Sequence, residues 1–346
     1  MRTRSSKDLA SSARKLPACK QRQPETSLMD TGMLVFPGQG AQYAGMGSDL
    51  YEAFDAARKV YDEAGEALGY DMRELSFKDP QGQIGLTRYT QPALLTHSIA
   101  CLRVTEAQSG GELTPQAAAG HSLGEYSALV AAGALAFDDA LRLVGERGRL
   151  MGEYGEGGML ALAMDAEEAR QLADRHCCQV AGLNLPAQTV VGGTQADLEQ
   201  LAADLAENYP RKRGTPLATE GAFHTYLMVT AAREFRDVLK RTVFRAPRFP
   251  VLSNYTARPH DAAPDAVRTR LFFQLINPVN WVGCMQWAVE NGVSSFLELG
   301  GGIGRGETPA EKRPNLQGIL KKYCRAAGHE AEISAVINAD DALALN

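Results

Sequence analysis

Short apolar runs alternate with longer amphipathic stretches along most of this chain, and this alternation restricts the fold more than any other feature. Residues 33–36 form an apolar run that ends at a Pro-Gly pair, as a buried strand does. Residues 49–68 place apolar side chains on one helical face. Gln91 and Pro92 open an apolar stretch that runs to about residue 108, and we expect a helix there with Pro92 near its first turn, where its missing N–H costs nothing. Alternating strands and helices predict an α/β fold.

The pattern changes between residues 158 and 217, where short strands outnumber helices. The expected order is strand, helix, strand, strand, helix, strand, which is the split βαβ unit of ferredoxin-like subdomains. We therefore expect a small ferredoxin-like subdomain at 158–217, inserted into a large catalytic domain made of residues 31–157 and 218–346. The expected strands are 159–164, 179–183, 189–191 and 214–217, and the expected helices are 166–175 and 195–207.

Composition supports a folded protein and excludes several classes. The 346 residues are 45% hydrophobic and 22% charged, which suffices for a sizeable core. The net charge of −5 gives no basic field for nucleic acid. The longest uncharged apolar run, 126–137, is far shorter than the roughly 20 residues of a membrane-spanning helix. Six cysteines without a Cys-x-x-Cys pair indicate neither a metal site nor a disulfide framework, so a cytoplasmic protein is expected.

Residues 1–30 differ from the rest of the chain. They hold seven Arg or Lys, three acidic residues and five Ser, without the apolar core of a secretory signal. We expect a disordered N-terminal extension here. The Arg and Ser content would suit an organelle transit peptide, but the acidic residues disfavour it, and a start of translation at Met29 or Met33 is the simpler explanation.

Residues 120–124 read Gly-His-Ser-Leu-Gly, a Gly-x-Ser-x-Gly pattern. Its small residues allow a strand to turn sharply into a helix with Ser122 at the apex, in a strained and exposed conformation. The helix N-terminus behind the serine would direct N–H groups at an oxyanion formed when Ser122 attacks a carbonyl. A chance pentapeptide in a turn is the competing interpretation, because such patterns are frequent in chains of this length.

Further motifs give this chain a resemblance to malonyl-CoA:acyl-carrier-protein transacylases and to the acyltransferase domains of polyketide synthases. The resemblance spans about residues 33–300, and the motifs follow the family's order. It implies an α/β-hydrolase-like large domain with a ferredoxin-like small one. The matching runs are FPGQGAQ at 36–42, QPA at 91–93, GHSLGE at 120–125, ERG at 146–148, Asn184-x-Pro186-x-Gln188, AFH at 222–224, the run from Gln274 to Trp281, and LELG at 297–300.

The resemblance also implies roles in nucleophilic catalysis. Ser122 would be the nucleophile and His224 its general base, with the backbone carbonyl of Gln274 orienting the histidine where other families use a carboxylate. The backbone N–H groups of Gln39 and Leu123 would form the oxyanion hole. Without the resemblance, the glycines that flank Gln39 indicate only a tight turn.

Other histidines are weaker candidates for the base. His121 adjoins the serine, but the bend should direct its side chain elsewhere. We interpret His97 as a hydrogen-bonded histidine within a helix and His176 as a surface histidine.

Arg147 lies 25 residues after Ser122, on a stretch with apolar residues at core-facing helical spacing. An isolated arginine in such a place is usually solvated or salt-bridged. The resemblance implies instead that Arg147 holds the distal carboxylate of malonyl, which a planar guanidinium can bind with two charge-assisted hydrogen bonds. The remaining expected substrate-binding residues are His121, Asn184, Phe223 and Gln274. Leu123 and Phe223 match malonyl-type motifs, so malonyl should be preferred over methylmalonyl.

The sequence therefore predicts a malonyltransferase that works by a ping-pong route through a Ser122 ester, in fatty-acid or polyketide biosynthesis. The expected partners are malonyl-CoA and a phosphopantetheinylated acyl carrier protein, and no cofactor or metal is expected. The enzyme should be a monomer that contacts neither nucleic acid nor membrane. A proofreading thioesterase and an inactive docking partner of a synthase are the alternatives. One departure from the family is the glycine-rich run at 300–306, followed by what looks like an added loop at 307–315.

Overall fold

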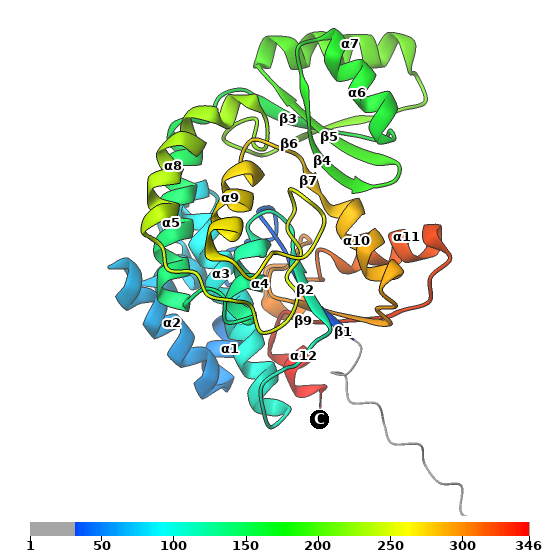
Figure 1. Cartoon of the computed structure of the whole chain (residues 1–346). Coiled ribbons are helices and arrows are strands. Elements are labelled where there is room, and N and C mark those ends of the chain that lie inside the picture. The colour runs from blue at the N-terminus through cyan, green and yellow to red at the C-terminus, as the bar shows by residue number, and fades with distance from the viewer. Residues whose placement is uncertain (1–31, 346) are drawn as a thin grey trace, which may run out of the picture.

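A four-stranded parallel sheet forms the middle of the computed structural model, which describes residues 32–345 (Figure 1). All three pairs of neighbouring strands are parallel, so the chain must cross over through other elements between them. The α/β fold class predicted from the sequence is confirmed. In sheet order the strands are β2 (Ala117–Gly120), β1 (Gly32–Phe36), β8 (Ser295–Leu299) and β9 (Glu332–Val336).

Strand β1 is apolar throughout because both faces of this sheet are covered. Leu34 and Phe36 pack into one core cluster, while Met33 and Val35 point the other way into a second cluster that contains Trp281. Successive side chains on a strand face opposite sides, so a strand buried on both sides reads as a continuous apolar run. Continuity of the run, rather than alternation, was therefore the correct signal for this strand.

Helices supply the cover on both sides of the sheet. In Figure 1, α2, α3, α5 and α8 lie to its left, and α10 and α11 lie to its right. Apart from α6 and α7, which are described with the second sheet below, the α-helices are α1 (Ser48–Ala53), α2 (Asp55–Leu68), α3 (Thr87–Gln108), α4 (Gly124–Ala131), α5 (Phe137–Glu153), α8 (Val229–Arg241), α9 (Pro264–Gln274), α10 (Trp281–Glu290), α11 (Gln317–Ala327) and α12 (Ala339–Leu343). Single turns are η1 (Glu74–Lys78), η2 (Tyr226–Met228) and η3 (Pro309–Glu311).

A second, five-stranded sheet lies at the top of Figure 1, with α6 (Ala166–Arg175) and α7 (Gln195–Asn208) packed on its outer face. The order of elements is the one expected between residues 158 and 217. A short strand from outside that segment also joins the sheet, parallel to its neighbour. The predicted domain boundaries stay a prediction. In sheet order the strands are β6 (Gly214–Leu217), β3 (Gly158–Leu162), β5 (Gln188–Gly193), β4 (Gln179–Leu185) and β7 (Val279–Asn280).

Two expectations about helices were wrong. The predicted helix at 49–68 is interrupted at Phe54, whose backbone is extended. Arg58 stabilises the interruption, because its guanidinium donates to the carbonyls of Tyr51 and Glu52 at the end of α1. The last four carbonyls of a helix have no partner within it, and a side chain from the next helix binds two of them here.

The second wrong expectation concerns Pro92, which lies inside α3 and not in its first turn. The helix begins at Thr87, whose N–H donates to the carboxylate of Glu220 at 2.5 Å. This partner is 133 residues away along the chain, so no local pattern indicated that the helix starts so early.

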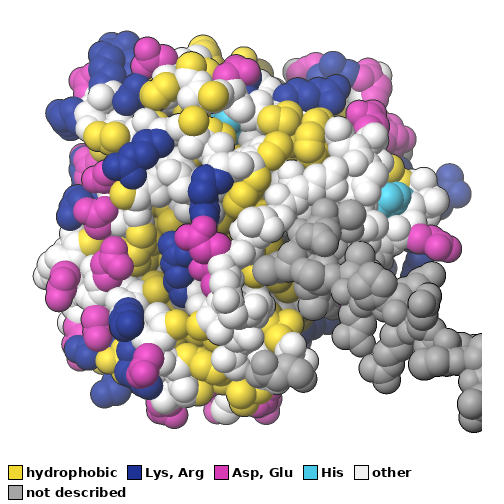
Figure 2. All heavy atoms as spheres, turned by 60° about the horizontal axis from the view of Figure 1, so that its bottom comes forward, with side chains coloured by type: hydrophobic (Ala, Val, Ile, Leu, Met, Phe, Trp, Pro, Cys, Tyr) yellow, Lys and Arg dark blue, Asp and Glu magenta, His cyan; other side chains and the backbone are white. Residues whose placement is uncertain are grey.

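Three further observations complete the fold. The predicted N-terminal extension, residues 1–30, lies outside the described residues. Between residues 32 and 345, no helix has the length and apolar character needed to cross a membrane. On the face shown in Figure 2, basic and acidic side chains are interspersed rather than gathered in a large area of one sign.

Candidate active site

Ser122 occupies the sharp bend between β2 and α4, with a positive φ of 52°. The flanking glycines make this bend possible. A Cβ on Gly120 would lie 1.8 Å from the backbone of Gly124, and a Cβ on Gly124 would lie 2.2 Å from the carbonyl oxygen of Phe36. Both spaces are filled by backbone, which cannot move aside cheaply. The pattern Gly-x-Ser-x-Gly is thus a packing requirement of the bend, and it leaves the serine hydroxyl facing a cavity.

His224 lies within hydrogen-bond distance of the serine. Its Nε2 is 2.8 Å from Ser122 Oγ, and its Nδ1 is 2.7 Å from the backbone carbonyl oxygen of Gln274. A carbonyl only accepts, so Nδ1 carries the proton and Nε2 is free to accept the serine proton. Burial and the nearby charge of Arg147 lower the pKa of His224 to about 3. The ring is therefore neutral at physiological pH and ready to act as a base.

Arg147 projects from α5 towards the same serine and is only 1% exposed. Its guanidinium donates to Ser122 Oγ and to the side-chain oxygen of Gln274, both at 3.1 Å, and to the side-chain oxygen of Gln91 at 2.9 Å. Its carbon lies 5.3 Å from the centre of the Tyr126 ring. Across residues 32–345, no carboxylate lies within salt-bridge distance of this guanidinium. A buried cation without an anion is unusual, because buried charges are normally paired.

The cavity in front of Ser122 has a volume of about 520 Å³ and lies between the two sheets. Met159, Ala181 and Val190 line it from the five-stranded sheet, and they are apolar. Of the nine predicted site residues, eight line this cavity. They are Gln39, His121, Ser122, Leu123, Arg147, Asn184, Phe223 and His224. The ninth, Gln274, is fully buried behind the serine, where it contacts the proposed catalytic groups, so its expected contact with substrate stays a prediction.

The backbone around the serine leaves a particular N–H group for an oxyanion. The N–H of Ser122 donates to Asn254 Oδ1 at 2.7 Å and is therefore occupied. The next residue, Leu123, begins the turn into α4 and lines the cavity together with Gln39. The Gln39 side chain is tied back to Thr87 Oγ1 at 3.1 Å, which fixes the loop that carries its backbone N–H.

The other histidines have their own partners. The ring of His121 pairs with Asn184 Oδ1 at 2.9 Å instead of contacting the serine hydroxyl, and burial lowers its pKa. His97, within α3, accepts from the N–H of Gly301 at 2.9 Å, as a hydrogen-bonded helix histidine should. His176 pairs with Asp204 at 2.7 Å in the periphery of the second sheet.

The departure from the family at 300–315 borders the cavity. Asn315 and Leu316 line the rim, and their N–H groups donate to the carboxylate of Glu298 on β8, both at 2.8 Å. Burial raises the pKa of Glu298 to about 7, while the backbone donors oppose that shift. One buried carboxylate thus ties this part of the rim to the parallel sheet.

Sequence reasoning missed two polar residues of this site. Gln91 belongs to a motif that was noticed, but nothing in the sequence indicated that its side chain would hold Arg147. Asn254 donates to the Gly120 carbonyl at 2.8 Å and accepts from Ser122, so it braces both sides of the bend. The one available signal was its place in a Ser-Asn pair directly after the short apolar run of Val251 and Leu252, where a strand end would place polar residues.

Comparisons with known proteins agree with this geometry. Residues 33–299 match the acyl transferase domain family. The malonyl CoA-acyl carrier protein transacylase of Bacillus subtilis (strain 168) is 43% identical over 300 residues, which cover 84% of this chain and 90% of that protein. The transacylase of the same name from Staphylococcus aureus (strain MRSA252) is 36% identical over 306 residues, covering 86% of this chain and 94% of its own length.

Solved structures give the same picture. The malonyl CoA-acyl carrier protein transacylase from Coxiella burnetii superimposes with a TM-score of 0.82 at 31% identity, covering 92% of this chain and 97% of that one. A malonyl-transacylase solved in complex with a type II polyketide synthase acyl-carrier protein gives a TM-score of 0.79 at 34% identity, covering 91% and 98%.

Proposed function

The chain belongs to the acyl transferase domain family, and we propose that it transfers malonyl from malonyl-CoA to the phosphopantetheine thiol of an acyl carrier protein. The observation that carries this proposal is Arg147. It is a buried cation that reaches the nucleophile's hydroxyl and has no carboxylate partner in the described part of the chain. An acyl group with a distal carboxylate would supply the missing anion within reach of Ser122.

In the first half-reaction, Ser122 becomes acylated. As its oxygen attacks the thioester carbonyl, the hydroxyl proton moves to His224 Nε2, which lies 2.8 Å away. The carbonyl oxygen becomes an oxyanion, which the N–H groups of Gln39 and Leu123 stabilise. When the tetrahedral intermediate collapses, the carbon–sulfur bond breaks and His224 returns the proton to the departing CoA thiolate. Arg147 holds the malonyl carboxylate throughout.

In the second half-reaction, the thiol of the carrier takes the place of CoA. His224 accepts the thiol proton while the sulfur attacks the ester carbonyl, and it then protonates Ser122 Oγ as the ester bond breaks. The Gln274 carbonyl holds Nδ1–H in both halves, so the ring keeps one orientation while it shuttles the proton. The cytoplasmic location, the monomeric state and the absence of nucleic-acid or membrane contacts stay predictions.

A single labelling experiment tests the proposed function. Purified protein is incubated with radiolabelled malonyl-CoA, with and without phosphopantetheinylated carrier protein. The proposal predicts label on the carrier. Free labelled malonate as the main product would identify a thioesterase, and absence of turnover would identify an inactive docking partner. Either of those results contradicts the proposal.

A further inference from the structure

A buried histidine–carboxylate pair lies behind the serine and takes no part in the mechanism described above. His260 Nε2 is 2.8 Å from Glu125 Oε1, and both side chains are 0% exposed. Glu125 belongs to the first turn of α4, three residues after the nucleophile, while His260 comes from the loop that precedes α9. Neither residue lines the cavity, so neither can touch the substrate directly.

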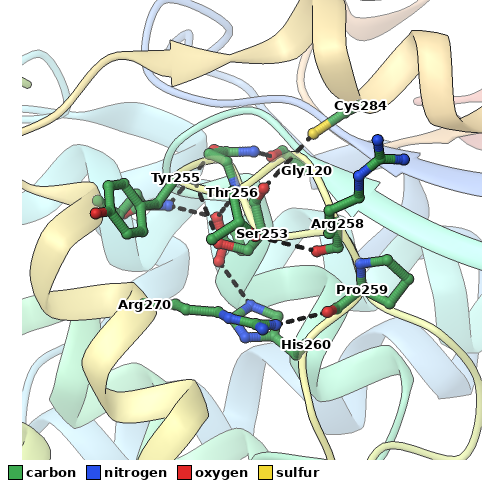
Figure 3. Close-up of polar contacts among 12 residues, drawn as sticks. Gly120, Ser253, Tyr255, Thr256, Arg258, Pro259, His260, Arg270 and Cys284 are labelled. Atoms are coloured by element: carbon green, nitrogen blue, oxygen red, sulfur yellow. Dashed lines mark hydrogen bonds and ion pairs between the residues drawn. The ribbon is translucent and has the colours of Figure 1, made fainter.

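The loop that carries His260 is held tightly, as Figure 3 shows. Arg270 donates to the carbonyl of Pro259 at 2.5 Å, and Ser253 N donates to the carbonyl of Arg258 at 3.0 Å. The backbone N–H of His260 itself donates to Val251 O at 2.8 Å. These bonds fix the backbone of the loop beside Glu125.

Among residues 32–345, His260 has one side-chain hydrogen-bond partner, Glu125. Its Nδ1 is buried without a partner among the described residues. The Glu125 carboxylate can only accept, so His260 Nε2 carries a proton and donates it to Glu125 Oε1. The bond to Glu125 is therefore the contact through which this ring reaches the rest of the network.

The other oxygen of Glu125 connects the pair to the groups behind the serine. Oε2 accepts from the backbone N–H of Asn254 and from Gln274 Nε2, each at 2.8 Å. Gln274 Nε2 also donates to the carbonyl of Ser122 at 3.0 Å. A carboxylate accepts only, so the amide nitrogen of Gln274 must face Glu125. Its oxygen then faces the opposite way, where Arg147 donates to it at 3.1 Å.

We propose that His260 and Glu125 are positioning residues for acyl transfer: the buried pair fixes the side-chain amide of Gln274 and thereby aims the Arg147 guanidinium at the substrate carboxylate. This inference rests on the proposed function and extends it to two buried residues that do not touch the substrate. Without the donor on His260, the Glu125 carboxylate turns to compensate and releases Gln274 Nε2. The Gln274 amide then keeps only the longer bonds from Nε2 to Ser122 O and Asn254 Oδ1, at 3.0 and 3.4 Å, and it can rotate. Arg147 keeps its bond to Gln91 but loses one of its two amide acceptors.

The test compares single-turnover acylation of Ser122 by malonyl-CoA and by acetyl-CoA, followed by intact mass. The rate constant reports the site, whereas the amplitude reports the fraction of folded protein, so a partly unfolded variant remains informative. In His260→Leu, which cannot donate, the ratio of malonyl to acetyl rate constants falls at least tenfold. In His260→Gln, whose amide can donate to Glu125, the ratio stays within threefold of the parent.

The matched control is His329→Leu. It removes a histidine hydrogen bond to the Val293 carbonyl, away from this network, and leaves the ratio unchanged. If His260→Leu does not fold, the same fall is expected in Glu125→Asp, which keeps the charge but withdraws the carboxylate from Gln274.

An unchanged ratio in His260→Leu, or in Glu125→Asp where His260→Leu cannot be measured, would make the pair purely structural and overturn the inference. Failure of His260→Gln to restore the ratio would also overturn it. The parent protein separates this inference from the proposed function: if the parent forms no malonyl ester on Ser122, the proposed function fails, whatever the variants do.

Discussion

The two sides of the cavity differ in polarity. The side formed by the parallel sheet is polar, and the groups behind Ser122 form a continuous buried hydrogen-bond network through Asn254, Glu125 and Gln274. The side formed by the five-stranded sheet is largely apolar: Met159 and Val190 face the cavity there, and Asn184 on β4 is its polar exception. Buried polar networks fix positions to fractions of an ångström, whereas apolar walls select by shape and volume. We therefore assign the chemistry to the first side and the choice of acyl substituent to the second.

Removal of the base should give the largest effect and would break the polar side. His224→Ala leaves the serine proton without an acceptor, so we expect acylation by malonyl-CoA to slow by about 10²–10⁴-fold. The measurement is the rate constant of Ser122 acylation. His176→Ala, a histidine that pairs with Asp204 outside the cavity, is the control and should match the parent. A loss of less than about tenfold in His224→Ala would show that another group accepts the proton.

Loss of the carboxylate partner comes next and affects only one class of acyl group. Arg147→Met keeps an unbranched side chain of similar length but cannot pair with the malonyl carboxylate. We therefore expect malonyl transfer to lose on the order of 2–5 kcal/mol of transition-state stabilisation. Acetyl has no distal carboxylate and should lose little or nothing. The ratio of kcat/KM for acetyl to malonyl, relative to the parent, should rise at least tenfold, with Tm recorded alongside. Equal losses for both substrates would make Arg147 structural.

A smaller change is expected where an aromatic ring limits the space beside the base. Phe223 is 5% exposed, lines the cavity and belongs to the same apolar cluster as Met159 and Val190 of the second side. Phe223→Ala makes room for an α-methyl group, a difference worth about 1–3 kcal/mol in a pocket of this kind. The expected result is a rise in kcat/KM for methylmalonyl-CoA relative to malonyl-CoA. The comparison of the two sides would need revision if the parent used both substrates equally well.

The smallest change in the acylation rate constant is predicted when the pH is varied. Because the pKa of His224 is lowered to about 3 from an ordinary value near 6.5, its neutral form persists as the pH falls. The acylation rate constant should thus stay flat between about pH 8 and pH 5, and an inflection near 6.5 would contradict the assignment.

The free energy of unfolding depends on pH in a different way: the unfolded chain takes up a proton on His224 near pH 6.5, and the folded chain does so only near 3. The unfolding free energy should therefore decrease as the pH falls through that window.

Local patterns predicted most of the fold. The strand at 33–36 and the alternating elements of the second sheet could be recognised because apolar periodicity and turn residues are properties of adjacent residues. The errors at Phe54 and Pro92 have the opposite origin. In both places a distant or later side chain, Arg58 in one and Glu220 in the other, supplies hydrogen bonds that decide where a helix begins or ends.

The site shows the same limit. Ser122 was a candidate from its pattern, because the bend requires glycines at fixed spacing, and the resemblance separated it from a chance pentapeptide. The roles of His224 and Arg147 came from resemblance, and the structure places both beside the serine. The supporting layer was not predictable, since Asn254 and His260 are brought to Glu125 by a loop about 130 residues later in the chain. Residues that act through tertiary contact leave no spacing pattern to read.

The central claim is that Ser122 carries the malonyl group between two thiols, and trapping that ester tests it most directly. The protein is mixed with malonyl-CoA in the absence of carrier, quenched in acid, digested and analysed by mass spectrometry. We predict one malonyl group on the peptide that contains Ser122, its disappearance when carrier protein is added before the quench, and no adduct in Ser122→Ala. Transfer to the carrier without any trapped ester on Ser122, or transfer that survives in Ser122→Ala, would contradict the account.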